Sequence, residues 1–452
     1  MRDEKSRERG AAEKQGEGAK KAVKEEKKPG GKAGFKPKAG NDRAKEKKEG
    51  LTVRKKEGQP EKKKEDRLEK KMDGSSCKAL KRCGACLGFA CGYEKQLEEK
   101  RQQVGKLLGS FGSVSPVLGM ENPYFYRNKV HRVFGRDNRG HDLYGNFEEG
   151  SHRIVTVGEC LIEDRLSQSV IDTVFSLLPS FKLRAYDEDL EWGFLRHVLV
   201  RRAFATGQLM VVLVTASSMF PGKNNFVKAL RSAHPEITTI VQSINSMHTN
   251  MILGEREVVL YGKGFIEDEL CGCRFRISPA SFYQVNHDQT EVLYGKAVEL
   301  AGLTGKETVL DAYCGIGTIG IVAAKHAKKV LGVENNPAAI KDAKLNAKAN
   351  GFDNLQFVCG DAGEYMQEMA ARGEALDMVF MDPPRAGSDK NFLEAILTLS
   401  PERVVYVSCN PETLARDLRT LTKKFQVKKM IPVDMFPATK HVETIVLMSR
   451  KL

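Results

Sequence analysis

From about residue 285 onward, the chain alternates short apolar runs with helical patterns. The runs have strand length and are rich in β-branched residues, and a glycine-rich turn and a helix follow the first one. This order predicts a doubly wound, mostly parallel α/β domain. In such a sheet, ligands bind at the carboxyl ends of the strands. The runs are ETVLDA, KVLGVE, LQFVC, LDMVFM, VVYVS and HVETIVLM.

The turn after the first run carries Gly315-x-Gly317-x-x-Gly320. This spacing matches the dinucleotide fingerprint, so an NAD-dependent oxidoreductase is one candidate function. Glu334 ends the second run, where a carboxylate can accept hydrogen bonds from ribose hydroxyls. Folds that bind dinucleotides and folds that bind S-adenosylmethionine both use such an acid. The glycines and Glu334 therefore leave both cofactors open.

Acids also stand at three other strand ends. Asp311 precedes the glycines and can orient the loop or the methionine part of a cofactor, and Asp361 can meet an adenine amino group. Asp382 begins Asp-Pro-Pro-Arg, whose prolines also fix a rigid turn. Arg385 stands where enzymes that methylate base amino groups have an aromatic residue, which argues for different chemistry on the base. Together, the four strand ends favour S-adenosylmethionine.

The fifth strand delivers a lone cysteine, Cys409, in Ser408-Cys409-Asn410-Pro411. A thiol at the carboxyl end of a strand is either a small packed side chain or a nucleophile. A free cysteine has a pKa of about 8.5, so covalent catalysis needs a lowered pKa or a proton acceptor nearby. The position of Cys409 makes it the candidate nucleophile.

Residues 120–275 contain short β-branched runs separated by Gly, Asn and charged turns, which predicts a mainly antiparallel sheet. Basic residues recur on these runs, and they form either a solvated face or a surface that positions phosphates. They are Arg127, Lys129, His131, Arg132, Arg196, His197, Arg201 and Arg202.

Cys77, Cys83 and Cys86 form a Cys-x5-Cys-x2-Cys cluster on glycine-containing turns. Thiolates that converge on one centre select zinc or an iron–sulfur cluster. No histidine stands at zinc-finger spacing nearby, which weakens a Cys2His2 site. The spacing alone leaves the fourth ligand open between Cys91 and a distant cysteine such as Cys160. Residues 93–108 follow with the pattern of an amphipathic helix.

The first 72 residues hold 26 Lys and Arg against 15 Asp and Glu, so they carry +11 of the chain's +14 formal charge. With Phe35 as their only aromatic residue, we expect a disordered tail. This tail is either a solubility segment or a non-specific tether for RNA. No apolar run approaches the roughly 20 residues of a membrane span, and the first residues lack a secretory signal. We therefore expect a cytoplasmic protein that does not associate with membranes.

Four motifs in this order, DAYCGIGT, DPPRAG, SCNP and HVET, resemble those of the RNA 5-methyluridine methyltransferases, which methylate carbon 5 of uracil. The resemblance spans residues from about 75 to 452. It implies a Rossmann-like class I methyltransferase domain that uses S-adenosyl-L-methionine. The cofactor residues that it implies are Gln284 in SFYQVN, Tyr313, Thr318, Glu334, Asp361 and Asp382.

Uracil chemistry explains why such an enzyme needs a thiol. Carbon 5 is a poor nucleophile until a thiolate adds to carbon 6, and Cys409 is our candidate for that thiolate. A base must then remove the carbon-5 proton, and we assign Glu443 of HVET to this role, with His441 as the alternative. Cys314 is expected to be a small packed side chain. The target base must also leave its RNA stack.

The cysteines resemble the iron–sulfur branch of the family, which implies a 4Fe–4S cluster on Cys77, Cys83, Cys86 and Cys160. That branch favours 23S ribosomal RNA as the substrate, with a transfer-RNA T-loop uridine as the alternative. A Lys-rich tail stands where many relatives have an OB-like barrel. A non-catalytic RNA-binding protein is the candidate from another class, and no obligate protein partner is evident.

The sequence thus predicts three parts. Residues 1–72 form the tail, residues 73–275 a cysteine-cluster and antiparallel β domain, and residues 276–452 the S-adenosylmethionine-dependent methyltransferase domain.

Overall fold

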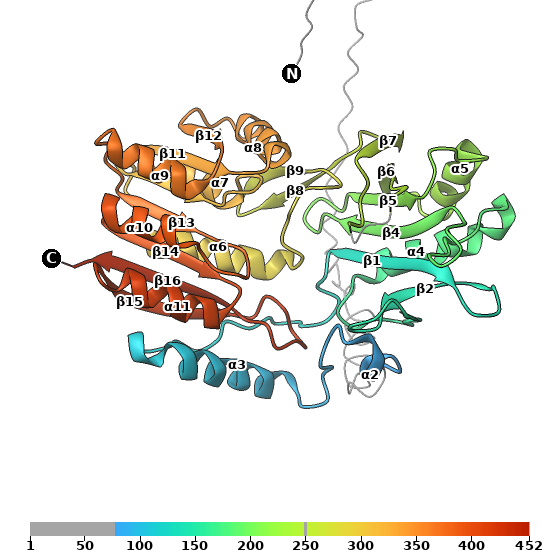
Figure 1. Ribbon diagram of the computed structural model, residues 1–452, viewed down its shortest axis with the longest axis horizontal. Helices are drawn as coiled ribbons and strands as arrows, with labels where there is room; N and C mark the ends of the chain where they lie inside the picture. Colours follow the sequence, from blue (N-terminus) through green and yellow to red (C-terminus); the bar gives the residue numbers. More distant parts are fainter. Residues whose placement is uncertain (1–76, 248–250, 452) are drawn as a thin grey trace, which may run out of the picture. The chain divides into compact units, whose positions relative to one another are not determined.

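The computed structural model describes residues 77–247 and 251–451. The predicted tail of residues 1–72 lies outside these residues. Two seven-stranded sheets and a two-stranded hairpin organise the described part of the chain (Figure 1). None of the helices in this part has the length and the apolar character that a membrane-spanning segment requires.

The first sheet has the strand order β3-β2-β1-β4-β5-β6-β7 and is antiparallel except at one pair. β5 and β6 run parallel because the helix α5 carries the chain back between them. The prediction of a mainly antiparallel region is therefore confirmed. The strands are β1 (Lys129–Arg136), β2 (Asp142–Phe147), β3 (Ile154–Val155), β4 (Leu195–Arg202), β5 (Leu209–Thr215), β6 (Ile237–Ile244) and β7 (Arg256–Tyr261).

Two helices cover one face of this sheet, α4 (Arg165–Leu177) and α5 (Lys223–Ala233). The apolar side of α4, with Val170 and Val174, packs on Phe134 and other buried residues of the strands. Asp164 caps α4 by accepting a hydrogen bond from the Ser167 backbone N–H at 2.8 Å. Neither helix was expected from the sequence, because the β-branched runs on both sides of them dominate the pattern of this region.

The second sheet has the order β12-β11-β10-β13-β14-β16-β15. The strands from β12 to β14 are parallel, and β16 runs antiparallel to β14. This is the predicted Rossmann-like architecture. The strands are β10 (Thr308–Ala312), β11 (Lys329–Glu334), β12 (Leu355–Cys359), β13 (Met378–Met381), β14 (Arg403–Ser408), β15 (Phe425–Val433) and β16 (Glu443–Arg450).

Helices cover both faces of the second sheet (Figure 1). Alternate residues of one strand, such as Val309 and Leu310, enter two different cores, because successive strand side chains point to opposite faces. The first core contains α6 (His287–Ala301), α7 (Thr318–Ala324) and α8 (Pro337–Ala349). The second core contains α9 (Ala362–Ala371), α10 (Lys390–Leu399), α11 (Pro411–Leu421) and α3 (Tyr93–Leu108). Short helical turns are α2 (Leu80–Cys83), η1 (Gly109–Phe111) and η2 (Pro179–Phe181).

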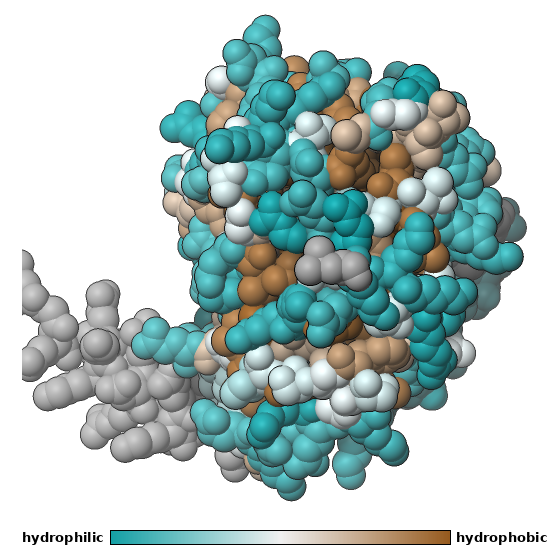
Figure 2. All heavy atoms as spheres, turned by 90° about the vertical axis from the view of Figure 1, so that its left-hand side faces the viewer, coloured by the Kyte–Doolittle hydropathy of each residue, from teal (hydrophilic) through white to brown (hydrophobic). Residues whose placement is uncertain are grey.

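The helix α3 has the bounds that the sequence predicts and is fixed to the second sheet by a buried ion pair. Lys100 Nζ lies 2.5 Å from Asp434 Oδ1, and the Tyr93 hydroxyl donates to Asp434 Oδ2 at 2.9 Å. Apolar side chains of α3, among them Val104, enter the second core. The outer face of the second sheet's helices and last strands is mostly hydrophilic, with apolar areas between the polar side chains (Figure 2).

The two sheets share one core through the hairpin of β8 (Ile266–Leu270) and β9 (Cys273–Ile277). Met210 and Val212 of β5 pack in the same cluster as Phe275 of β9 and Val309 of β10. The predicted boundary at residue 275 falls inside β9. The three predicted domain ranges stay a prediction.

Candidate active site

The glycine-rich loop between β10 and α7 is held by Asp311. Asp311 Oδ2 accepts a hydrogen bond from the Gly320 backbone N–H at 2.7 Å. A β-carbon at Gly320 would lie 2.7 Å from that oxygen, so only glycine permits this approach. Gly317 has φ +84°, and its β-carbon would meet the Phe357 ring. Asp311 thus orients the loop, which is one of the two roles that the sequence allowed.

Glu334 ends β11 beside the same loop. Its Oε2 accepts from the Gly315 N–H at 3.2 Å, and its Oε1 accepts from the Asn336 N–H at 2.9 Å. The carboxylate is therefore fixed in place where it borders the cavity described next. Asp361 differs, because it is exposed and caps α9 by accepting from the Glu364 N–H at 3.0 Å.

One cavity of about 740 Å³ opens at the carboxyl ends of β10, β11, β13 and β14. It brings together both predicted catalytic residues and five of the six predicted cofactor residues, and Asp361 is not in its lining. Its walls come from distant parts of the sequence. Lining residues are Ala85, Arg127, Phe282, Gln284, Tyr294, Asp311, Tyr313, Cys314, Gly315, Ile316, Thr318, Ile319, Glu334, Asn335, Asp382, Pro383, Pro384, Arg385, Cys409, Phe436, Thr439, His441 and Glu443.

Three acids make the floor of this cavity strongly acidic. Burial raises the pKa of Asp311 and of Asp382 to about 7 each. Burial and the neighbouring Asp382 raise the pKa of Glu443 well above its usual value, and Arg385 opposes this shift. Glu443 is 3% exposed. Such a floor suits a ligand that brings a positive charge.

Cys409 follows β14 directly and is half-buried in the cavity wall. Burial raises the pKa of its thiol to about 11, the carboxylates of Glu443 and Asp382 add to the shift, and Arg385 opposes it. The Asn410 side chain holds the loop by donating to the Arg385 carbonyl at 3.2 Å and by accepting from the Glu412 N–H at 3.1 Å. The thiol is thus protonated in the free protein, with a carboxylate nearby.

His441 lines the cavity but pairs with Arg385. Its Nδ1 lies 2.6 Å from Arg385 Nη2, and burial and the guanidinium lower its pKa. This contact favours a positioning role for His441. Cys314 is buried against the loop, as expected of a small packed side chain.

Several cavity residues were not among the predicted site residues. Tyr294 of α6 is buried and lies within hydrogen-bonding reach of Thr318 and Gln284. Phe282 is 71% exposed, and Ala85 lies between two cysteines of the cluster. The aromatic residue in SFYQVN was a usable signal for Phe282. Ala85 carries no chemical group that a motif search detects.

The four cysteines of the predicted cluster come together in one apolar cluster. Cys160 is buried with Phe89 and Ile162, and Cys77, Cys83 and Cys86 pack against this core. In the described residues, no three or more His, Cys, Asp or Glu side chains are grouped so as to hold a metal ion. The iron–sulfur cluster therefore stays a prediction. Cys91 is exposed, and its thiol contacts the adjacent Gly92 carbonyl.

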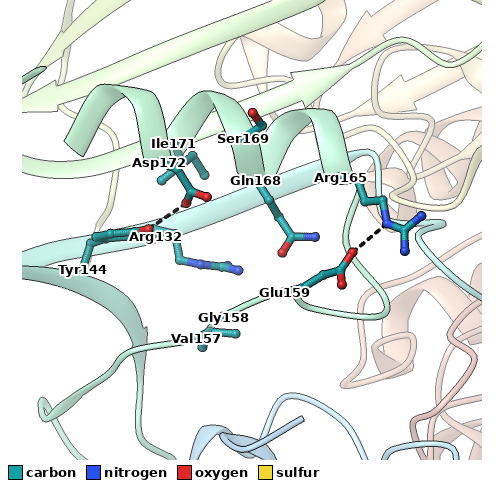
Figure 3. Close-up of a pocket in the computed structure, with 10 residues that line it drawn as sticks. All are labelled: Arg132, Tyr144, Val157, Gly158, Glu159, Arg165, Gln168, Ser169, Ile171 and Asp172. Carbon is teal, nitrogen blue, oxygen red and sulfur yellow. Dashed lines mark hydrogen bonds and ion pairs between the residues drawn. The ribbon is translucent and has the colours of Figure 1, made fainter. Parts of the chain in front are cut away.

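A second cavity, of about 350 Å³, lies next to the Cys160 loop under α4 (Figure 3). Tyr144 donates to Asp172 at 2.7 Å, and Arg165 Nε donates to Glu159 at 2.7 Å, as the dashed lines in Figure 3 mark. Gln168 binds the backbone of Cys160 through both ends of its amide. These polar groups are satisfied within the protein and support the loop.

Four of the eight basic residues of this region are buried, and the other four are half-buried. The alternative of a solvated face is therefore wrong for the buried ones, which are Arg132, Arg196, His197 and Arg201. Arg132 forms two hydrogen bonds with Glu163, and Arg196 Nη1 donates to the Asn245 and Met247 carbonyls. Their function is to join strands and loops. Arg127 and Lys129 are different, because no hydrogen bond or ion pair of their side chains appears within the described residues.

The family model described as tRNA (uracil-5-)-methyltransferase matches residues 92–451 of the chain. The chain belongs to this family. The expected family is thereby confirmed, and an NAD-dependent oxidoreductase is not supported. Within the family, the chain is similar to an uncharacterized RNA methyltransferase of Staphylococcus aureus strain MRSA252, with 44% identity over 380 residues, 83% of this chain and 84% of that one. An uncharacterized RNA methyltransferase of Halalkalibacterium halodurans is also 44% identical, over 381 residues and 83% of each chain.

A solved structure gives the family a three-dimensional comparison. The tRNA (uracil-54, C5)-methyltransferase of Pyrococcus abyssi, in complex with S-adenosyl-L-homocysteine, matches with a TM-score of 0.67 and 30% identity. The match covers 79% of this chain and 83% of that one. The methyltransferase fold is therefore shared across both sheets.

Proposed function

We propose that this family member methylates carbon 5 of a specific uridine in RNA, with S-adenosylmethionine as the methyl donor and a covalent Cys409–uracil intermediate. One observation carries the proposal: Cys409 and Glu443 line the same cavity as Gln284, Thr318 and Glu334. The proposed nucleophile, the proposed base and most of the predicted cofactor residues thus line one cavity.

The cavity residues fit the cofactor by their chemistry. Glu334 offers a fixed carboxylate for ribose hydroxyls, and Gln284 and Thr318 offer polar groups beside the glycine loop. The acidic floor of Asp311 and Asp382 complements a sulfonium cation. When bound, the cofactor supplies an electrophilic methyl group.

The remaining chemistry belongs to the chain. The Cys409 thiol gives up its proton to a carboxylate, and the thiolate sulfur forms a bond to carbon 6 of uracil. The electron pair of the 5,6 double bond then makes carbon 5 nucleophilic for methylation. Glu443 removes the proton of carbon 5, the double bond re-forms, and the carbon–sulfur bond breaks to return the thiolate.

For the substrate we propose 23S ribosomal RNA, which the cysteine motif of the iron–sulfur branch favours. A transfer-RNA uridine is the alternative, and the similarity to the Pyrococcus abyssi tRNA enzyme supports it. Mass mapping of 5-methyluridine in both RNAs, from cells with and without this gene, separates the two. Loss of a ribosomal 5-methyluridine is the expected result, and loss of a transfer-RNA one would favour the alternative.

We further propose that Cys77, Cys83, Cys86 and Cys160 hold a 4Fe–4S cluster with a structural role. Support comes from the donor set, four thiols around one apolar cluster, with Cys91 exposed outside it. The Ala85 backbone between two of these cysteines also borders the active-site cavity. The cluster would thus stabilise one wall of the site.

RNA containing 5-fluorouridine tests the mechanism, because fluorine cannot leave carbon 5 as a proton. We expect wild-type enzyme to form a covalent protein–RNA adduct that shifts on a denaturing gel. Cys409→Ala should form none while still binding the cofactor. The matched control is Cys359→Ala, which removes an exposed thiol outside the cavity. An adduct with Cys409→Ala would show that the nucleophile is misassigned.

The same gel tests Glu443 with ordinary RNA. Glu443→Gln should allow attack and methylation but not the final proton removal, so a methylated adduct should accumulate. Loss of a general base costs about two to four orders of magnitude in rate, which makes the intermediate long-lived. Turnover at the wild-type rate without an adduct would show that another group is the base.

A further inference from the structure

Three cations gather where β1 and β4 meet the active-site cavity. Arg127 lines the cavity, and Lys129 begins β1 two residues later, close enough for Arg127 to act on its charge. Lys129 stands directly opposite Arg201 in the antiparallel pairing of β1 with β4. The neighbouring strand residues on this side, such as Leu199, pack into the core that both sheets share.

None of these cations has a carboxylate partner within the described residues. Arg201 is 1% exposed, and both of its terminal nitrogens donate to the Ser281 carbonyl at 3.0 Å, while its Nε has no partner. Lys129 and Arg127 make no side-chain hydrogen bond or ion pair there. By contrast, Arg202 on the other side of β4 is paired with Asp164 at 2.8 Å.

Uncompensated positive charge in a partly buried place is costly. Burial lowers the pKa of Lys129 to about 8, and the neighbouring Arg201 and Arg127 contribute to the shift. Cations that are shielded from water and have no carboxylate partner are what we expect of a site that binds an anion. An anion between Lys129 and Arg127 would replace the missing carboxylate and satisfy their donors.

We propose that Lys129 and Arg127 form a seat for an RNA backbone phosphate next to the nucleotide whose base enters the cavity, with Arg201 as buried positive support. This inference rests on the proposed function. A base that enters the cavity brings its flanking phosphates to the cavity mouth, and Arg127 is one of the residues that line this cavity. The seat would fix the position of the backbone without reading the sequence.

The salt dependence of RNA binding tests this seat in the full-length protein. The probe is a fluorescein-labelled oligouridylate, and its dissociation constant is measured by anisotropy across a range of salt concentrations. Lys129→Gln should weaken binding about tenfold and reduce the slope of log K against log salt by about 0.7, the value for one single-strand phosphate contact. Lys129→Arg keeps the charge and should stay near wild type.

The matched control is Lys228→Gln, which removes an exposed lysine of α5 on the opposite face of the sheet. It should leave the slope of log K unchanged relative to wild type. Lys129→Gln should also leave the thermal midpoint unchanged or raised, because it removes an unpaired charge. A lowered midpoint with an unchanged slope would mean a structural role and would overturn the seat.

The two proposals fail in different ways. If Lys129→Gln leaves the slope of log K against log salt unchanged while wild type still forms the fluorouridine adduct, the phosphate seat is overturned. The proposed function is then unaffected. A reduced slope without any adduct in wild type supports the seat and contradicts the covalent mechanism.

Discussion

The surroundings of the Cys409 thiol favour its protonated form. Burial is the main cause, and Glu443 and Asp382 add negative charge, so that its pKa is about 11. A protonated thiol reacts slowly with electrophiles. If Cys409 is the nucleophile, ligands that neutralise the acids around it should lower its pKa.

Substitution of Glu443 should therefore make Cys409 more reactive in the free protein. At the alkaline pH where the thiol titrates, Glu443→Gln removes the negative charge of the ionised Glu443, so the thiol pKa falls and the pH profile of alkylation moves to lower pH. Mass spectrometry of the Cys409 peptide after iodoacetamide treatment measures this rate. Glu364→Gln, on exposed α9 surface, is the control and should not move the profile. A profile that moves to higher pH would contradict this electrostatic description.

Sequence motifs predicted which residues come together where a strand end fixes their position, while their chemical roles stay predictions. Seven of the eight predicted catalytic and cofactor residues line one cavity. Asp361 lies outside the cavity lining and caps α9, and Asp361 with Glu364 three residues later has the pattern of a capping box. Its predicted contact with adenine stays a prediction. The sequence places Arg127 on a basic face that is either solvated or positions phosphates, but it does not place Arg127 at the cavity, because that position depends on how the two sheets pack.

At the scale of elements, buried polar pairs join parts that are far apart in the sequence. The pair of Lys100 with Asp434 fixes α3 to the segment between β15 and β16, and neither side chain is exposed by more than a few per cent. The sequence gives the bounds of α3 from its apolar periodicity. It does not reveal this partner, because the two residues are 334 positions apart.

Lys100→Ala should strongly destabilise the fold. It leaves Asp434 buried without its cation, and loss of one partner of a buried pair costs about 3 kcal/mol. Urea unfolding measures the free energy of unfolding. The control Lys95→Ala removes an exposed lysine of the same helix and should change this free energy by less than about 0.5 kcal/mol. Equal effects of both substitutions would contradict the importance of the buried pair.

A second pair, His131 and His197, joins β1 and β4 with Nε2 and Nδ1 3.2 Å apart. Burial lowers the pKa of His131 to about 3 and that of His197 to about 4, with help from neighbouring cations. Below about pH 6.5, the usual histidine pKa, these two histidines bind protons in the unfolded chain but stay neutral in the folded protein. The free energy of unfolding should therefore fall as the pH drops from 6.5 toward 4.

His197→Gln should remove part of this pH dependence, by about 2 kcal/mol between neutral pH and pH 4. Chemical unfolding of wild type and variant at several pH values gives the difference. His326→Gln, at an exposed position, is the control and should leave the dependence as it is in wild type. An unchanged dependence in His197→Gln would mean that other groups cause the loss of stability in acid.

At the scale of the whole molecule, the cysteine cluster and the active site are neighbours. The Leu87 N–H donates to the Ala438 carbonyl at 2.6 Å, and Ala438 packs in the same apolar cluster as Cys160. Thr439 and His441, just after Ala438, line the active-site cavity. Disorder of the segment around the cysteines would therefore also disturb the residues that line the cavity.

Purified protein kept anaerobic should be brown and contain iron and acid-labile sulfide. Cys160→Ala should lose iron and also lower the affinity for the cofactor, because a cavity wall loses its support. Cys91→Ala is the matched control and should keep both. Stoichiometric zinc without iron, or iron retained in Cys160→Ala and lost in Cys91→Ala, would contradict the proposed ligands.

The core that both sheets share also bears on how this family diversifies. Met210 and Val212 of the first sheet interlock with Phe275 and Val309, so recombination that exchanges one sheet alone would join two mismatched halves of a hydrophobic interior. The relatives described above accordingly align over 83% of this chain rather than over one sheet. A chimera that exchanges one sheet for that of a relative should therefore be less stable than either parent unless the residues of the shared core are exchanged with it.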